Sequence, residues 1–524
     1  MLPAATLTSE PIGQEADGYP VTRYHLQAQV VLSSRRVALA LLALLLAVSA
    51  LVALKTRNTY DTGDSIQHYM IAHFVPQHPL NLLDAWGKPL FTLVAAGPAQ
   101  AGFLGMKLLQ CALVALSAWL AYGVARRLQM TWPALVILLC YAAPDYFRIQ
   151  FSGLTEPLFG ALLIGAVALA VADRPVLSTV LISWLPFVRS EGALLWGLWV
   201  LYLVWNGYWR ALPWLALGYA VYSVAGGLAL GDYAWLFTNN PYSLHSQYGS
   251  GRWATFLEHY PTLLGWPTTL LFAVGAVYML RRLLVARNWG QRLFRAELLL
   301  ICGPIVVHTL AHSLFWAFGL FGSFGLTRVM TVLVPLCALV ALRGLGWLAQ
   351  AARTAPARRW VLGGATAAVV LLTFAHDHTF KLSPTGTDIG HQANLHWRRD
   401  FTEQSDLMLA DAGTAWLRQH DPGWRWHPIA FEHPYFPMVL NVDYFQPGLR
   451  APLTHDYRPY LDGVPVGTYV FWDSWFAPVE GRLPLDQLEA DKRFRKLWHG
   501  SIGANIDDPN SWRHRLAIFE KVRQ

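Results

Sequence analysis

Residues 37–54 read VALALLALLLAVSALVAL, an apolar run interrupted only by Ser49 and preceded by Arg35 and Arg36. A helix needs about 20 apolar residues to cross the hydrocarbon core of a bilayer, and local geometry allows somewhat fewer. Similar runs recur through the first 375 residues. We predict about eleven transmembrane helices, near residues 37–54, 103–125, 131–147, 154–172, 175–188, 192–206, 211–230, 262–280, 297–320, 327–349 and 360–376. The predicted fold class is therefore mainly α, a polytopic membrane protein.

The composition of the whole chain agrees with a membrane protein. Of its 524 residues, 54% are hydrophobic and only 14% are charged, whereas soluble proteins carry about 25% charged residues. The formal net charge of +8 comes from the first 375 residues, which hold 24 Lys and Arg against 13 Asp and Glu. No contiguous basic face is visible, so nucleic acid is not a predicted partner. The four cysteines lie within apolar runs, where buried free thiols are expected.

The arginines alternate between the two ends of the predicted helices. Most of them fall in turns that face the cytoplasm if the N-terminus is inside: Arg126, Arg127, Arg174, Arg210, Arg281, Arg282, Arg287, Arg292, Arg295, Arg353, Arg358 and Arg359. The opposite turns hold little more than Arg148, Arg189, Arg252 and Arg328. The positive-inside rule therefore places the N-terminus in the cytoplasm and, with an odd number of helices, the C-terminus outside. For a bacterium, that is the periplasmic face of the inner membrane.

Three regions follow from these patterns. Residues 1–36 form a cytoplasmic tail without a small-residue cleavage site, as in an uncleaved signal anchor. Residues 37–376 form the transmembrane module, with a long first periplasmic loop at 55–102 that contains short amphipathic helices. Residues 377–524 form a small periplasmic α/β domain. In that domain, helical periodicity at 402–419 and 484–495 alternates with strand-like stretches at 428–432, 467–473 and 515–521.

Acidic residues at the outer ends of the predicted helices are candidates for chemistry, because burying charge near hydrocarbon is costly unless the charge has a role. Asp64 lies in the first loop, with His68 one helical turn later. Asp145 lies in the second outer turn, and Glu156 begins the next helix. Structural alternatives exist: Asp64 and Gln67 resemble a capping box, and Glu156 suits the dipole of a helix N-terminus.

Two outer arginines are candidates for binding an anion. Arg189 lies two residues before Glu191, and Arg328 follows a glycine-containing turn. The planar guanidinium matches two oxygens of a phosphate, although Arg189 and Glu191 could also form only a local ion pair.

Other polar groups favour structural interpretations. His308 and His312 have the spacing of two metal ligands on one helix face, but no third ligand is evident, which favours packing. In the C-terminal domain, polar groups among aromatic residues suit turns of a small domain. These are Glu432-His433, Trp472-Asp473-Ser-Trp475-Phe476 and Glu480.

Taken together, these features resemble the GT-C superfamily of integral-membrane glycosyltransferases. The resemblance is to bacterial members related to the protein O-mannosyltransferases, the aminoarabinose lipid A transferases and the GPI mannosyltransferases. It rests on Asp64 with His68, Trp86-Gly-Lys-Pro-Leu-Phe, Asp145, Glu156 and Arg189-Ser-Glu191-Gly. In this chain Ser65 follows Asp64, whereas the O-mannosyltransferases have an Asp-Glu pair there. The donor sugar and the acceptor, whether lipid, glycan or protein, therefore stay open.

The resemblance implies an inverting transfer of a sugar from a polyprenyl-phosphate donor to an acceptor at the outer face of the inner membrane, with a mannosyltransferase as one form. Asp64, oriented by His68, is expected to act as general base, with Asp145 and Glu156 as further catalytic carboxylates. The same carboxylates, Asp64, Asp145 and Glu156, are a candidate set for Mg²⁺ or Mn²⁺.

The donor phosphate is assigned to the arginines. Arg189, held by Glu191, and Arg328 are expected to stabilise the negative charge that the leaving phosphate gains. Because guanidinium groups can supply this charge, no metal cofactor is required.

Two other classes are compatible with many membrane helices. A lipid or glycan transporter or flippase usually shows inverted repeats with broken helices, and none is visible here. A non-catalytic scaffold in contact with membrane lipids would not need ionisable residues in several turns of one face.

The arginine alternation makes a testable prediction of topology. A reporter fused after Gln524 should report a periplasmic location, and one fused near Arg287 a cytoplasmic location. Alkaline phosphatase and green fluorescent protein fusions measure the two sides. Both reporters on the same side would contradict the predicted topology.

Overall fold

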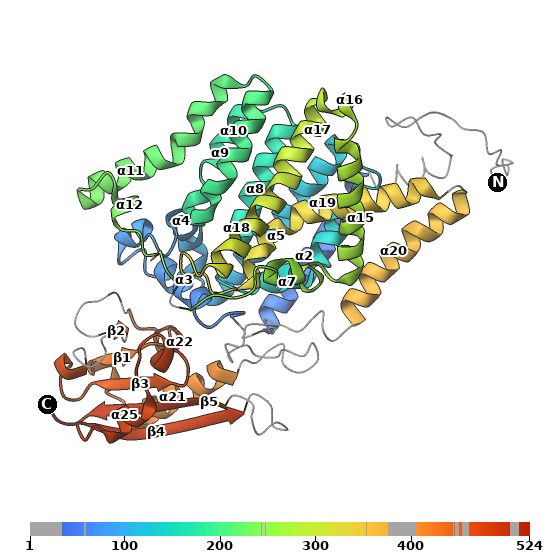
Figure 1. Ribbon diagram of the computed structural model, residues 1–524. Coiled ribbons are helices and arrows are strands. Elements are labelled where there is room, and N and C mark those ends of the chain that lie inside the picture. Colours follow the sequence, from blue (N-terminus) through green and yellow to red (C-terminus); the bar gives the residue numbers. More distant parts are fainter. Residues whose placement is uncertain are drawn as a thin grey trace. The chain divides into compact units, whose positions relative to one another are not determined.

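The computed structural model describes residues 34–56, 59–242, 244–246, 248–352, 354–375, 405–443, 445, 450–452, 461–503 and 513–524. The predicted tail up to residue 33 and the start of the predicted C-terminal domain lie outside these residues. The chain divides into two compact units. One, here the helical unit, comprises residues 1–50, 111–149 and 156–379; the other, the mixed unit, comprises 51–110, 150–155 and 380–524. Figure 1 labels their elements.

The helical unit consists of helices alone in its described part. In chain order these are α2 (Arg35–Lys55), α5 (Gly102–Arg127), α6 (Leu135–Tyr141), α7 (Pro144–Ile149), α8 (Glu156–Val171), α9 (Pro175–Ile182), η2 (Leu185–Phe187), η3 (Ser190–Leu195), α10 (Trp196–Trp205), η4 (Trp209–Ala216), α11 (Leu217–Leu230), α12 (Trp235–Thr238), α13 (Thr255–Glu258), α14 (Tyr260–Leu264), α15 (Trp266–Leu283), α16 (Ala286–Trp289), α17 (Arg292–Ala296), η5 (Glu297–Cys302), α18 (Gly303–Ala317), η6 (Thr327–Leu333), α19 (Val334–Ala351) and α20 (Ala355–Ala375). The last residues of α2 and the first of α5 belong to the mixed unit.

Five of the described helices are long and apolar enough to cross a membrane. They are Arg35–Lys55, Gly102–Arg127, Trp209–Leu230, Arg292–Ala317 and Thr327–Ala351. A sixth span results if Thr255–Leu264 and Trp266–Leu283, which meet at 119°, count as one. Several other predicted spans are shorter apolar helices or are broken near a proline, as at Pro144 and Pro186, because proline cannot donate the helical hydrogen bond. The count of about eleven stays a prediction.

The centre of the helical unit is α19, which is buried along almost its whole length. Glycines allow α15 to approach it closely. A Cβ atom at Gly275 would lie 1.9 Å from the Val340 carbonyl oxygen, and one at Gly344 would lie 2.1 Å from the Leu271 carbonyl oxygen. Small residues at such contacts let helix backbones meet where dispersion, rather than the hydrophobic effect, drives helix packing.

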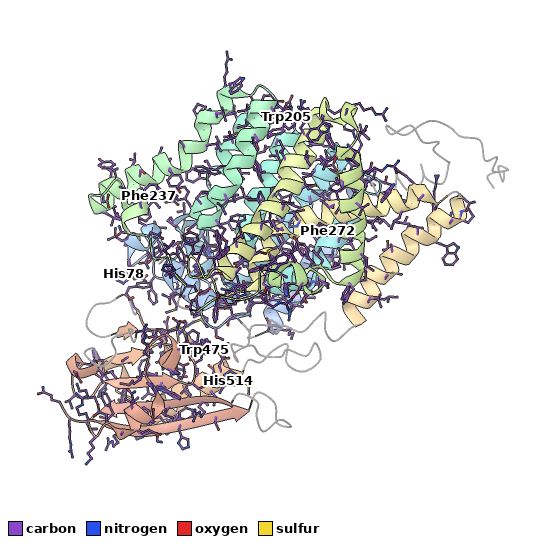
Figure 2. All side chains as sticks on the ribbon, in the orientation of Figure 1. His78, Trp205, Phe237, Phe272, Trp475 and His514 are labelled. Atoms are coloured by element: carbon purple, nitrogen blue, oxygen red, sulfur yellow. The ribbon has the colours of Figure 1, made fainter. Side chains whose placement is uncertain are left out.

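The surface of the helical unit is apolar. Large side chains such as Trp205 and Phe237 are 46% and 71% exposed, and both project from the helices in Figure 2. An exposed apolar surface of this extent is costly in water but is the ordinary surface of a protein in lipid. The helical unit is thus that of a multi-pass membrane protein.

The mixed unit joins the first loop to the C-terminal domain. Its loop elements are α3 (Asp64–His73), η1 (Pro79–Leu83) and α4 (Pro89–Ala99). Its C-terminal elements are α21 (Ser405–His420), η8 (Trp424–Trp426), β1 (Ile429–Phe431), α22 (Tyr435–Leu440), β2 (Arg450–Pro452), β3 (Tyr469–Asp473), α24 (Phe476–Val479), α25 (Leu485–Ala490), β4 (Phe494–Gly503) and β5 (Arg513–Lys521). A hydrogen bond connects the two parts: His78 Nε2 lies 2.6 Å from Asp443 Oδ2.

The five strands form one sheet in the order β2-β1-β3-β5-β4. Strand β1 is parallel to β2 and β3, whereas β5 is antiparallel to β3 and β4. The predicted strands at 428–432, 467–473 and 515–521 correspond to β1, β3 and β5. The predicted helix at 484–495 was too long, because α25 ends at Ala490 and Phe494 already begins the β4–β5 pairing.

Both faces of this sheet are covered, which gives the domain its core. Val470, Trp472 and Phe519 pack on one face with Leu488 of α25. On the other face, Phe436 of α22 contacts Phe471, with ring centroids 4.5 Å apart. Alternate residues of β3 thus face opposite layers, as the two-residue period of a strand requires.

Candidate functional site

Glu156 is the centre of a charged cluster in the helical unit. It is the first residue of α8 and is only 1% exposed. Its Oε1 atom accepts a hydrogen bond from Arg189 Nη1 at 2.8 Å and lies 3.7 Å from Arg328 Nε. Its Oε2 atom is buried and has no hydrogen-bond partner among the described residues. Buried polar atoms are almost always satisfied, so an exception is a reason to look for a ligand.

Arg189 links this carboxylate to a second one. It lies in the turn between η2 and η3, and its Nε donates to Glu191 Oε1 at 2.5 Å. The side chains of Arg189 and Glu191 are 19% and 14% exposed. The pair predicted from the Arg-x-Glu spacing therefore forms, but it is enclosed by the protein rather than lying on the surface.

The two arginines come from distant parts of the sequence. Arg328 is in the first turn of η6 and is 8% exposed, and Arg189 lies almost 140 residues earlier. Burying either charge alone would be expensive, whereas a shared carboxylate offsets part of that cost. Glu156, Arg189, Glu191 and Arg328 are called the arginine cluster below.

Two histidines of α18 border the arginine cluster. His308 Nε2 lies 3.1 Å from the Val329 carbonyl oxygen, a hydrogen bond that fixes this ring. His312 lies with its ring centroid 4.4 Å from that of His308, and its Nε2 is 3.6 Å from Glu191 Oε1. The pair thus packs beside the cluster, in line with the structural interpretation of its spacing.

Both carboxylate oxygens of Asp145 contact basic side chains. Oδ1 accepts a hydrogen bond from Arg148 at 2.7 Å, and Oδ2 lies 2.8 Å from His259 Nε2. His259 could not be predicted from the sequence, because it lies 114 residues from Asp145 and no local motif marks it. A carboxylate with two partners of this kind ties α7 to the turn before α14, which favours a positioning role for Asp145.

In the mixed unit, Asp61 rather than Asp64 caps the first-loop helix. The Oδ1 atom of Asp61 accepts hydrogen bonds from the backbone N–H groups of Gly63 and Ser65, at 2.9 and 3.2 Å. Asp64 is the half-buried first residue of α3, and no side-chain cap hydrogen bond is made at Gly63, the residue before it. The hydrogen bonds of Asp61 thus cap the start of α3, and the capping interpretation of Asp64 stays a prediction.

His68 lies one turn after Asp64 on α3, as predicted. Its ring stacks on Trp86, with centroids 4.7 Å apart, and meets the edge of Phe91 at 5.4 Å. The Trp86-Gly-Lys-Pro stretch is therefore packed against α3. The stacked ring of Trp86 and the T-shaped contact with Phe91 hold the His68 ring in position, which a residue that orients another group requires.

Lys88, in the Trp86-Gly-Lys-Pro stretch, is a further buried cation of the first loop. It is 7% exposed, and its Nζ donates to the Ala85 carbonyl oxygen at 3.2 Å. Its φ of 64° lies in the left-handed region that non-glycine residues rarely adopt. Such a conformation just before Pro89, in a buried lysine, is typical of functional loops.

The residues present do not form an evident metal site. Among the described residues, no group of three or more His, Cys, Asp or Glu side chains is placed to hold a metal ion. Both oxygens of Asp145 and one oxygen of Glu156 already contact basic side chains. The binding of Mg²⁺ or Mn²⁺ by Asp64, Asp145 and Glu156 stays a prediction.

The C-terminal domain holds a second group of acidic residues. Asp473 is 4% exposed and accepts hydrogen bonds from the backbone N–H groups of Trp475, Phe476 and Ala477. These three residues lie at the start of α24, which runs from Phe476 to Val479. Asp473 lines a small cavity with Trp475 and His514 (Figure 2). Burial raises the pKa of Asp473. These hydrogen bonds stabilise a turn, which is the structural role that the sequence predicts for this segment.

Glu432 is mostly buried, and it interacts electrostatically with Asp473. Burial, together with the nearby Asp473 and Glu480 carboxylates, raises the pKa of Glu432 to about 9. Its Oε2 atom has no hydrogen-bond partner among the described residues. The folded domain therefore holds this carboxyl protonated at neutral pH.

Comparison with known proteins supports the fold. No protein-family model and no curated protein sequence matches this chain. The crystal structure of ArnT from Cupriavidus metallidurans bound to undecaprenyl phosphate matches it with a TM-score of 0.60 and 13% identity, over 93% of this chain and 98% of ArnT. The apo crystal structure of the same protein gives 0.59 and 13%, over 92% and 97%.

The chain therefore has the fold of ArnT along nearly its whole length. The resemblance to the GT-C glycosyltransferases that the sequence indicated is confirmed at the level of fold. At 13% identity, the likeness concerns the arrangement of the backbone, and the roles of individual residues rest on the geometry described above.

The raised pKa of Glu432 predicts a pH dependence of stability. Between the ordinary value of 4.5 and about 9, the folded state keeps the proton and the unfolded state releases it, so stability falls as pH rises. The substitution Glu432→Gln removes this loss of folding stability at high pH. The variant should unfold at a temperature a few degrees above wild type at pH 8 and at the same temperature at pH 5, measured by tryptophan fluorescence.

The matched control is Glu489→Gln, whose side chain is 40% exposed and pairs with Lys496. It should leave the pH dependence unchanged. A Glu432→Gln curve parallel to that of wild type from pH 5 to pH 8 would contradict the assignment.

Proposed function

We propose that this protein is an inverting glycosyltransferase of the bacterial inner membrane that takes its sugar from a polyprenyl-phosphate donor. The observation that carries the proposal is the arginine cluster, which brings two buried guanidinium groups to one carboxylate in a chain with the ArnT fold. ArnT was crystallised with undecaprenyl phosphate, which supports a polyprenyl phosphate as the lipid carrier here. The acceptor faces the periplasm in this proposal.

Arg189 and Arg328 are the groups proposed to bind the donor phosphate. As the sugar leaves, negative charge grows on the lipid phosphate, and fixed positive charges stabilise that change most when they are already in place. Glu191 and Glu156 hold the guanidinium of Arg189 at 2.5 and 2.8 Å. The arginine is thus oriented before the substrate arrives, and no metal ion is needed to supply the charge.

Glu156 also limits how strongly the site holds its product. Its carboxylate competes with a phosphate for the same guanidinium groups, so the product phosphate meets a partly neutralised site. A site that bound phosphate with two unopposed arginines would retain the product tightly. The shared carboxylate therefore favours release after the transfer.

Asp64 is the group proposed to remove the proton from the acceptor hydroxyl. Asp64 is the first residue of α3, and the stacked ring of His68 lies one turn after it. A general base acts through a carboxylate oxygen within hydrogen-bond reach of the hydroxyl. Displacement at the anomeric carbon then inverts its configuration, with the polyprenyl phosphate as leaving group.

The phosphate assignment predicts the effect of Arg189→Lys. A lysine keeps the charge but cannot form the planar two-pronged contact, so turnover should fall by about 10- to 1,000-fold. The assay is the release of free undecaprenyl phosphate by purified protein in detergent, from donors carrying radiolabelled aminoarabinose, mannose or other sugars. Arg210→Lys, at an exposed position, is the matched control and should retain wild-type turnover.

Two outcomes contradict this assignment. Wild-type turnover in Arg189→Lys would remove this arginine from donor binding. If purified wild-type protein carries intact donor across liposome membranes and never cleaves any of the sugars tested, the protein is a transporter rather than an enzyme.

The base assignment predicts that Asp64→Asn lowers turnover by about two to four orders of magnitude. Binding of undecaprenyl phosphate, measured by the shift in thermal midpoint, should stay within a factor of two. Asp61→Asn is the control, because asparagine caps helices as well as aspartate does, and its turnover should be near that of wild type. Equal turnover in wild type and Asp64→Asn would exclude Asp64 as the base.

A further inference from the structure

The helical unit contains a long apolar groove, and no residue of the arginine cluster lines it. Its volume is about 820 Å³, and side chains from α2, α5, α8 and α9 line it. Leu116, Leu162 and Leu169 are typical of its walls, which are almost entirely hydrocarbon. If a methylene group needs about the space of a water molecule, about 30 Å³, the groove accommodates roughly the carbon atoms of one long acyl chain and part of a second.

One part of the groove is strongly basic. Arg35, in the first turn of α2, and Arg126 and Arg127, the last residues of α5, all line it. All three are exposed, and in the part of the chain that the structure describes none of them pairs with a carboxylate. The guanidinium groups of Arg35 and Arg126 lie over aromatic rings, each 5.8 Å from the ring centre of Trp119 or Tyr122. These stacked rings steady the side chains.

The groove combines apolar walls with three arginine side chains that have no carboxylate partner in the described part of the chain. Such a groove fits a molecule with a long apolar body and an anionic head group. The arginine alternation assigns Arg35, Arg126 and Arg127 to the cytoplasmic ends of their helices, whereas Arg189 and Arg328 belong to the opposite ends. The cytoplasmic leaflet supplies anionic lipids, and basic pockets between helices at this depth bind their head groups.

We propose that this groove is a binding site for an anionic glycerophospholipid of the cytoplasmic leaflet, with its phosphate on Arg35, Arg126 and Arg127 and an acyl chain along α5 and α8. The lipid holds α2 to the bundle. That helix needs such a partner, because most of its surface is not covered by the rest of the protein. The proposal does not depend on the transfer reaction.

Gly123 offers a clean way to fill the groove. It lines the groove on α5, and a Cβ atom added there would meet no other heavy atom within 4 Å. A phenylalanine at this position therefore projects into the space of the lipid without a clash at its first carbon. Gly363, on α20, also has open space at its Cβ and does not line the groove, so Gly363→Phe is the matched control.

The experiment measures lipid binding to purified, delipidated protein by native mass spectrometry. The probes are phosphatidylglycerol and phosphatidylcholine with the same acyl chains. Wild type should bind the first phosphatidylglycerol at least tenfold more tightly than phosphatidylcholine. The triple variant Arg35→Ala/Arg126→Ala/Arg127→Ala should lose that preference, and Gly123→Phe should weaken binding of the first phosphatidylglycerol at least tenfold.

A charge control separates a built site from general attraction to basic protein. Arg210→Ala/Arg281→Ala/Arg287→Ala removes three exposed arginines that do not line the groove, and it should keep the wild-type preference. Phosphatidylglycerol should also raise the thermal midpoint of wild type, and less so that of Gly123→Phe. The arginine variant tests the site independently if Gly123→Phe does not fold.

Three results would overturn the proposal. Equal affinity of wild type for the two lipids would mean that ordinary surrounding lipid fills the groove. Equal loss of preference in both triple variants would mean that net charge, and not this site, selects the lipid. If Gly123→Phe abolishes binding of undecaprenyl phosphate but not of phosphatidylglycerol, the groove belongs to the polyprenyl donor.

Discussion

The buried carboxylate of Glu156 constrains much of the helical unit. A charge that is 1% exposed at the start of α8 needs cationic partners, and Arg189 and Arg328 supply them from two turns far apart in the sequence. Removing one partner of a buried ion pair typically costs about 3–5 kcal/mol, because the other charge stays buried. The bundle can therefore fold in this way only if the turn before η3 and the first turn of η6 both reach α8. The same requirement gives the cluster its rigid geometry.

The same geometry bears on the proposed role of Glu156 in the transfer reaction. Glu156 uses one oxygen for the arginines, and its other oxygen has no hydrogen-bond partner within the described chain. Asp145, by contrast, has Arg148 on one oxygen and His259 on the other. Two acidic residues that look alike in sequence thus differ in what they leave available to a substrate. This difference favours Glu156 over Asp145 as a group that faces the reaction.

Much of this arrangement could be predicted from the sequence. Apolar run length indicated the helical class, and strand-like alternation located β1, β3 and β5. The Arg189–Glu191 pair followed from spacing alone. Cross-chain pairs such as Asp145 with His259 could not be predicted, because no local rule relates residues 114 positions apart. The helix cap was ambiguous for another reason: Asp61 precedes α3 and Asp64 is its first residue, and only the hydrogen bonds from Gly63 and Ser65 identify Asp61 as the cap.

The central claim is that Arg189 and Arg328 together bind the phosphate of a polyprenyl carrier, and a bound structure tests it most directly. Wild-type protein in lipid nanodiscs with undecaprenyl phosphate can be imaged by electron cryomicroscopy. The account predicts phosphate density within hydrogen-bond distance of both guanidinium groups, and loss of that density in Arg189→Lys. Well-resolved phosphate density elsewhere in the protein, with Arg189 and Arg328 still closed on Glu156, would contradict it.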